Sequence, residues 1–306
     1  MPKNISLSEI KKYKNKFLKN NKNTASRNAL IKNDLNTVAL NWENYSKINH
    51  HFSNLIKKEL PATDQKASGR CWGFAGLNLM RLKVVENLDL PNFEFSQNYF
   101  MFWDKLEKAN YFLENIIQTK DHAYDSRLIM HLVKAPVQDG GQWDMFVNLI
   151  NKYGAVPKDV MPETNHSSKS MAMNYILTHK LREFASILRK KRLKNLSSLK
   201  KEMMGVIFNL LAMFLGQPPD IINWSTRNKD NKYFVISDMT PKDFCKKYAD
   251  INIKDKVCLI HAPMSNKKFN TVYTVEYLGN VVEGQIIKYL NVDVQKLKKS
   301  AIQSIK

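Results

Sequence analysis

Cysteine is scarce in this 306-residue chain, which has only Cys71, Cys245 and Cys258. No two of them form a CxxC pair, and three are too few for a disulfide scaffold in a chain of this size. The scarcity argues against a secreted, disulfide-stabilised domain. We therefore expect free thiols, a reducing compartment and a cytoplasmic protein.

Long apolar runs are missing as well. The longest, VIFNLLAMFLG at 206–216, is about half of the ~20 residues that a membrane-spanning helix needs. The first twenty residues are polar and lysine-rich and lack the apolar core of a signal peptide. No P-loop, HExxH motif, zinc-type spacing or internal repeat occurs. We expect no membrane partner, no metal and no cofactor.

Acidic residues are few relative to basic ones. The 28 Asp and Glu residues face 48 Lys and Arg residues, which gives a formal net charge of +20. Such an excess favours polyanionic partners through steering and counterion release. The lysines lie among many asparagines, so compositional drift and a merely solvated surface explain the charge equally well.

The chain divides by pattern into four segments within an α+β fold. Helical periodicity at 161–216 predicts two long helices with a break near Leu196–Ser198. A period of two in the apolar residues predicts strands at 232–238, 256–263 and 270–280. The segments are a basic arm at 1–60, a segment with a helix from Cys71 at 61–160, a helix-and-strand segment at 161–290, and an amphipathic helix capped by Asp293 at 291–306.

The stretch DQKASGRCWGFAG, from Asp64 to Gly76, places Cys71 at the start of a predicted helix. A free thiol is mostly protonated at neutral pH, and helix-terminal amides or a cation lower its pKa. The amides and the neighbouring Arg70 are candidate sources of that effect. Gln65 offers an N–H group to an oxyanion, together with the backbone N–H of Cys71. The alternative for Cys71 is a small buried hydrophobic residue.

A second turn-rich stretch, APVQDGGQWDM at 135–145, pairs Gly140 with Gly141 and is followed by Trp143. Paired glycines allow a close approach of the backbone to another group. A buried aromatic anchor for the loop is one role that fits Trp143.

The segment DQKASGRCWGFAGLNLMR closely resembles the active-site segment of the bleomycin hydrolase and aminopeptidase C branch of the papain-like cysteine peptidases. Further segments resemble successive parts of that family in the same order: FEFSQNYFMFWDKLEKANYFLENI, DGGQWDMFVNLINKYGAVPK, MNYILTHKLREFASILR, LGQPPDIINW and YTVEYLGN. The resemblance covers the chain from about residue 40 to its end.

This resemblance implies a papain-like fold made mainly of the helical left lobe and a family insertion at 161–290, without most of the right-lobe barrel. It implies Cys71 as nucleophile, Gln65 as oxyanion-hole residue, and Gly140, Gly141 and Trp143 at the peptide-binding cleft. The arm at 1–60 weakly resembles the hook that the family uses in assembly.

A papain-like site also needs a histidine as base and acid and an Asn or Asp to orient it. By the resemblance, both motifs would lie beyond the part of the family that this sequence matches. The histidines present are His50, His51, His122, His131, His166, His179 and His261. His261, near a predicted strand end, is the first to inspect, although its matched position is not the catalytic one.

Two functions of different classes follow. The first is a cysteine-type aminopeptidase acting on peptides, incomplete or inactive as this chain alone unless a complementing chain supplies the missing half. The second is a non-catalytic basic protein that binds nucleic acid or serves as a scaffold. Family members form basic-channelled hexamers, so a homo-oligomer is expected by resemblance.

Overall fold

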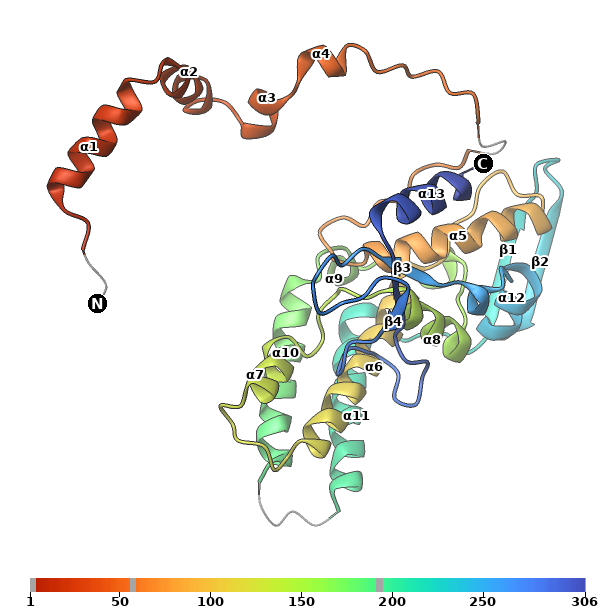
Figure 1. Cartoon of the computed structure of the whole chain (residues 1–306). Coiled ribbons are helices and arrows are strands. Elements are labelled where there is room, and N and C mark those ends of the chain that lie inside the picture. The colour runs from red at the N-terminus through yellow and green to blue at the C-terminus, as the bar shows by residue number, and fades with distance from the viewer. Residues whose placement is uncertain (1–3, 56–58, 191–194, 306) are drawn as a thin grey trace. The chain divides into compact units, whose positions relative to one another are not determined.

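The structure is a computed structural model that describes residues 4–55, 59–190 and 195–305 (Figure 1). Contacts divide the chain into two compact units, Met1–Lys58 and Glu59–Lys306. The first unit contains four helices: α1 (Leu7–Leu18), α2 (Asn21–Leu30), α3 (Leu35–Ala39) and α4 (Trp42–Tyr45).

Side-chain caps define the helices of the first unit. Ser6 and Glu9 form a reciprocal capping box on α1, and Asn20, Asp34 and Asn41 cap the next three helices. No described residue of these helices is buried. The apolar side chains in this unit are therefore exposed within the chain itself, Leu35 and Trp42 among them.

The second unit is built around α6 (Gln97–Gln118), which has fifteen buried residues. Phe102, Leu113 and Ile116 on this helix are fully enclosed. Two long helices, α10 (Met171–Leu188) and α11 (Leu196–Leu215), run beside α6 and contact it (Figure 1). The other helical elements of this unit are α5 (Cys71–Asn87), α7 (Arg127–Lys134), α8 (Trp143–Tyr153), η1 (Lys158–Val160), α9 (Asn165–Ser168), α12 (Pro241–Tyr248), η2 (Ile253–Asp255) and α13 (Val294–Ser304).

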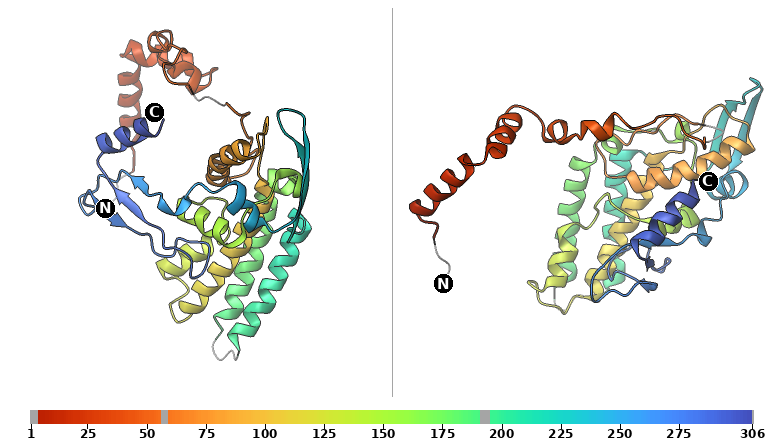
Figure 2. Two further views of the ribbon diagram at one scale, coloured as in Figure 1. Left: turned by 90° about the vertical axis from the view of Figure 1, so that its right-hand side faces the viewer. Right: turned by 45° about the horizontal axis from the view of Figure 1, so that its top comes forward.

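The strands form two small sheets. An antiparallel hairpin pairs β1 (Ile222–Arg227) with β2 (Tyr233–Met239), with a bulge between Ile222 and Trp224. In the other sheet β5 (Tyr289–Asn291) is central, parallel to β3 (Cys258–Ile260) and antiparallel to β4 (Thr271–Tyr273). The two sheets lie on different sides of the helices (Figure 2).

Several expectations from the sequence are confirmed. Helix α5 begins at Cys71 and buries Phe74, Leu77 and Val84, and Asp293 caps α13. The two long helices predicted within 161–216 are confirmed, but α10 ends at Leu188 and α11 begins at Leu196, so the break lies before Leu196 and not at Leu196–Ser198. The strands predicted at 256–263 and 270–280 shorten to three residues each, since pairing with β5 extends no further.

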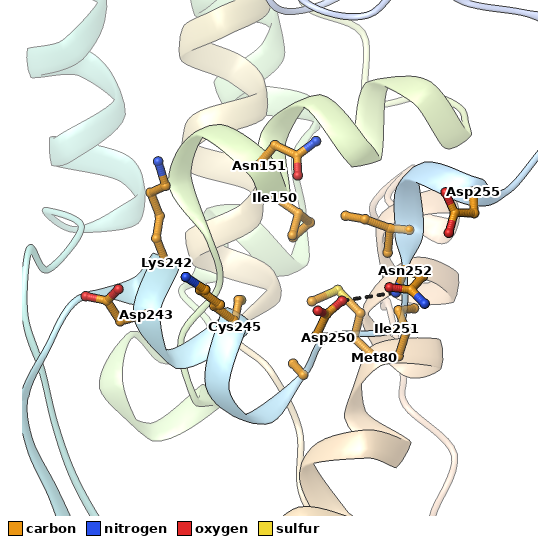
Figure 3. A pocket seen from close by; sticks show the side chains of 13 residues that line it. Met80, Ile150, Asn151, Lys242, Asp243, Cys245, Asp250, Ile251, Asn252 and Asp255 are labelled. Atoms are coloured by element: carbon orange, nitrogen blue, oxygen red, sulfur yellow. Dashed lines mark hydrogen bonds between the residues drawn. The ribbon is translucent and has the colours of Figure 1, made fainter.

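A cavity of about 600 Å³ lies beside α12, with Met80 and Ile150 in its lining (Figure 3). The buried thiol of Cys245 faces this region from α12. None of the site residues predicted from the sequence lines the cavity. No helix among the described residues combines the length and apolar character that crossing a membrane requires.

Candidate active site

The turn before Cys71 is held by reciprocal hydrogen bonds. The side-chain amide of Gln65 donates to the carbonyl of Ser68 at 2.8 Å, and the Ser68 hydroxyl donates to the carbonyl of Gln65 at 2.7 Å. An amide nitrogen carries two hydrogens, so the bond to Ser68 leaves a second N–H on Gln65 for another acceptor. The turn therefore orders the Gln65 side chain without using all of its donors.

Cys71 is exposed at the first residue of α5. Among the described residues its Sγ atom has no hydrogen-bond partner. The residue preceding the helix, Arg70, makes no side-chain cap, so the first-turn amides are not occupied by a capping oxygen. The alternative of a buried, inert cysteine does not describe Cys71, whereas it does describe Cys245.

Arg70 is not aimed at the thiol. Its two terminal nitrogens donate to the Glu163 carboxylate at 3.0 and 2.8 Å, and its Nε donates to the Ser68 hydroxyl at 2.9 Å. The Arg70 side chain is only 4% exposed, and the bidentate pair balances its charge. Of the two candidate sources of positive potential beside Cys71, the helix amides remain.

Two buried lysines of α6, Lys105 and Lys108, donate hydrogen bonds to the loop that carries Gly140 and Gly141. The Lys105 ammonium donates to the carbonyl of Val137 and to the carboxylate of Asp139, both at 2.5 Å. The Lys108 ammonium donates to the carbonyls of Gln138 and Gly140 at 2.8 and 2.7 Å. These bonds fix the backbone on both sides of Asp139.

Asp139 joins this loop to the turn before Cys71. Its carboxylate accepts the backbone N–H of Gly69 at 2.9 Å, and its backbone carbonyl accepts the indole N–H of Trp72 at 2.7 Å. Gly69 and Trp72 flank Cys71 in the sequence. The structure thus brings the glycine loop and the Cys71 turn together.

Electrostatics in this region follow from burial. Desolvation opposes ionisation of Asp139, but the Lys105 charge and hydrogen bonds from Lys105, Ser170 and Gly69 outweigh it and hold the pKa of Asp139 well below its usual range. Burial and the neighbouring Lys108 lower the pKa of Lys105 to about 8, against the opposing effect of Asp139 and Asp104. Burial also raises the pKa of Asp104, although Lys108 lies beside it.

The two glycines have different surroundings. A β-carbon at Gly141 would lie 2.5 Å from the Trp72 ring, whereas no heavy atom lies within 4 Å of the corresponding position at Gly140. The tight approach predicted for the pair therefore applies to Gly141. Gly140 is exposed and borders open space.

Trp143 begins α8 and is half-buried. Its ring stacks on Phe146, with the ring centroids 5.6 Å apart. Its indole N–H is buried and has no hydrogen-bond partner among the described residues. This packing on Phe146 is the contact that an anchor for the loop would make.

Three of the histidines contact groups other than Cys71. His261 follows β3, stacks on Phe269 and places Nδ1 2.9 Å from the carbonyl of Val292. His166 packs on Phe214, and His179 on Tyr175. In the part of the chain that the structure describes, no histidine is hydrogen-bonded to Cys71. No group of three His, Cys, Asp or Glu side chains suited to a metal occurs among the residues described.

Sequence reasoning missed the residues that hold the site in place: Lys105, Lys108, Asp139, Ser170 and Asn174. A usable signal existed in α6, because two lysines three residues apart lie within a strongly apolar helix. Buried lysines require a carboxylate or carbonyl partner. Asp139, directly before the glycine pair, was the available candidate.

Comparison with known proteins places the chain in a family. Residues 4–306 match the model of the peptidase C1-like family. The chain belongs to that family. It is 44% identical over 308 residues to aminopeptidase C of Listeria innocua serovar 6a, covering 100% of this chain and 70% of that protein. It is 38% identical over 296 residues to bleomycin hydrolase of Homo sapiens, covering 92% of this chain and 64% of that protein.

The fold comparison agrees. The crystal structure of PepW from Lactobacillus rhamnosis HN001 aligns with a TM-score of 0.95 and 39% identity, covering 100% of this chain and 69% of that one. This peptidase C1-like chain therefore has the mixed helix-and-sheet, papain-like fold of a family of cysteine peptidases. It spans 64–70% of the length of the relatives named here.

Proposed function

We propose that this chain carries the nucleophile part of a cysteine aminopeptidase of the bleomycin hydrolase type, with peptides as substrates. The observation that carries the proposal is the position of Cys71, exposed at the uncapped start of a 17-residue helix. A helix start presents free amide groups and positive potential, and these favour a thiolate. The names of the relatives, aminopeptidase C and bleomycin hydrolase, agree with this chemistry.

The first step is acylation. The Cys71 thiol gives its proton to an imidazole, Cys71 Sγ bonds to the substrate carbonyl carbon, and the carbonyl oxygen becomes an oxyanion. The free N–H of Gln65 and the backbone N–H of Cys71 are the proposed donors to that oxygen. Collapse of the intermediate breaks the C–N bond and releases the amine, which takes a proton from an imidazolium. Water then hydrolyses the thioester, and the Cys71 thiol is regenerated.

The cleft for the peptide follows from the glycine loop. Gly140 is exposed with open space around it, so its backbone is accessible to an extended peptide. Gly141 is held under Trp72, and Lys108 fixes the carbonyl of Gly140. We assign Gly140 and Gly141 to substrate-backbone binding, and Trp143 to support of the same loop through Phe146.

The imidazole is the missing element of the reaction. No described histidine bonds to Cys71, and His261 is occupied by Val292 and Phe269. We propose that the base, its orienting residue and most of the right lobe come from outside these 306 residues, from further polypeptide or a complementing chain. Catalytic residues act as a unit, so turnover by these residues alone is expected to be very low.

Two measurements test the proposal. Cleavage of aminoacyl fluorogenic substrates by the 306-residue chain is expected to match that of its Cys71→Ala variant. Thiol-dependent turnover well above the variant would contradict the missing base. Iodoacetamide should alkylate Cys71 in the folded chain, and a Cys71 thiol that reacts only after unfolding would contradict the nucleophile assignment.

A second function, binding of nucleic acid, has a specific observation in its favour. The segment 1–60 has twelve Lys and Arg residues against four Asp and Glu, and the described helices within it bury no residue. Its exposed apolar residues also make it a candidate for oligomer assembly. Salt-dependent binding of single-stranded DNA would support the first role. Concentration-dependent mass in light scattering, lost in Trp42→Glu, would support the second.

A further inference from the structure

The carboxylate of Asp139 lies at the centre of a hydrogen-bond network with four donors. Its Oδ1 atom accepts from Lys105 at 2.5 Å and from Asn174 at 2.6 Å. Its Oδ2 atom accepts from the backbone N–H of Gly69 at 2.9 Å and from the hydroxyl of Ser170. The donors come from the turn before α5, from α6, and from the start of α10.

The same residue reaches both sides of Cys71. The carboxylate bonds to Gly69, two residues before the thiol, and the backbone carbonyl bonds to Trp72, one residue after it. We propose that Asp139 is a positioning residue, which fixes the turn presenting Cys71 and locks it to the substrate-binding glycine loop. This inference rests on the proposed function of Cys71 as nucleophile.

The charge of Asp139 is required by its partner. The Lys105 side chain is 1% exposed, and the described residues give its ammonium only the Val137 carbonyl and Asp139. A buried ammonium without a counterion is strongly unfavourable. The low pKa of Asp139 agrees with a carboxylate that stays ionised throughout the working pH range.

The shape of Asp139 is required as well. Its β-carbon lies 2.7 Å from the position that a β-carbon at Gly69 would take, so the Asp139 side chain packs directly against the backbone of Gly69. A glutamate is one methylene longer and cannot place its oxygens at the same points. An asparagine at position 139 has one acceptor oxygen in place of two. Its amide hydrogens would point at the N–H donors of Asn174 or Gly69 and could not accept from them.

The test separates positioning from charge balance. In the double variant Asp139→Asn/Lys105→Met the buried charges are removed together, so the core carries no uncompensated ammonium. The matched control, Asn174→Ala, removes a donor to the same carboxylate but leaves the contacts to Gly69 and Trp72. Thermal denaturation of the full 306-residue chains establishes a temperature at which all three proteins are folded.

The readout is the rate of Cys71 alkylation by iodoacetamide between pH 5 and 9, measured by peptide mass spectrometry. Loss of positioning is expected to lower the alkylation rate at pH 6 by about fivefold or more, because the turn no longer holds the Cys71 thiol at the free amides of the helix start. The control should stay within about twofold of wild type. A folded double variant with the wild-type profile, or a control that changes equally, would overturn the inference.

Deuterium uptake distinguishes failure of the positioning role of Asp139 from failure of the proposed function of Cys71. If Cys71 of the folded wild-type chain is not alkylated, the nucleophile assignment fails, and the positioning role is then decided by deuterium exchange alone. The double variant is expected to show faster uptake in peptides covering 65–72 and 137–143, with peptides of α11 unchanged. Unchanged uptake in both segments overturns the positioning role of Asp139, independently of the alkylation rate of Cys71.

Discussion

The indole ring of Trp72 packs against Gly141. A β-carbon at position 141 would lie 2.5 Å from this ring. The indole cannot easily move aside. Its N–H donates to the carbonyl of Asp139 at 2.7 Å, and the ammonium of Lys108 lies 5.2 Å from the ring centroid. Trp72, the residue after Cys71, thus limits the size of the side chain that position 141 of the glycine loop can carry.

The glycine pair provides a first prediction, because its members differ in one respect. Gly141→Ala should lower the free energy of unfolding by about 1–3 kcal/mol, the usual cost of overpacking. Gly140→Ala, with open space around its β-carbon, should change it by no more than about 0.5 kcal/mol. Urea unfolding of both variants checks this. Equal effects would show that Trp72 does not restrict position 141.

The ion pair between Arg70 and Glu163, next to Cys71, gives a second prediction. Arg70 is 4% exposed and Glu163 24% exposed, and two hydrogen bonds join them. Glu163→Gln leaves a buried guanidinium without its counterion and should cost about 2–4 kcal/mol. Asp64→Asn removes the exposed pair with Lys66 in the same turn and serves as the control. Its unfolding curve should match wild type, and an equal loss in both variants would contradict a special role for burial.

The three thiols should react in a fixed order, which is the third prediction. Cys71 is exposed, Cys258 is half-buried and Cys245 is buried. Burial, and to a lesser degree Asp144, raises the pKa of Cys258. Alkylation of the native protein should therefore label Cys71 first, Cys258 slowly and Cys245 only on unfolding. Mass spectrometry of timed samples measures the order. Similar rates in urea are the control, and early native labelling of Cys245 would contradict the packing of α12.

The sequence predicted the parts of the site that depend on local pattern. A glycine-arginine turn before an apolar helical period predicts a cysteine in the first turn of α5, and the structure confirms this position. Asp293 was recognisable as a cap because capping is local. The assignments of Gln65, Gly140, Gly141 and Trp143 stay predictions that rest on the family.

What the sequence did not predict depends on contacts between distant segments. Asp139 and Gly69 are seventy residues apart, and no periodicity links them. Arg70 was considered as a cation for Cys71, but its partner Glu163 lies 93 residues away and could not be identified from local pattern. Strand β5 has three residues and exists because β3 and β4 pair with it from both sides. Propensity over so short a segment carries little information.

The buried thiol of Cys245 gives the last prediction, on alkaline stability. Burial raises the pKa of Cys245 to about 12, and the thiol donates a hydrogen bond to the Ala155 carbonyl. Above pH ~9 the unfolded state loses the Cys245 proton, whereas the folded state retains it. The stabilisation from this group is therefore complete below pH ~9 and declines as the pH rises toward 12. At pH 10.5 the loss should be about 2 kcal/mol. Urea unfolding at pH 8 and pH 10.5 measures it.

Two variants isolate this contribution from the other groups that titrate at alkaline pH. Cys245→Ala removes the buried thiol, so its stability should fall less between the two pH values than that of wild type, although it starts lower because a buried side chain has been shortened. Cys71→Ala removes an exposed thiol and should fall as steeply as wild type. The same pH dependence in Cys245→Ala and wild type would mean that the buried thiol does not retain its proton.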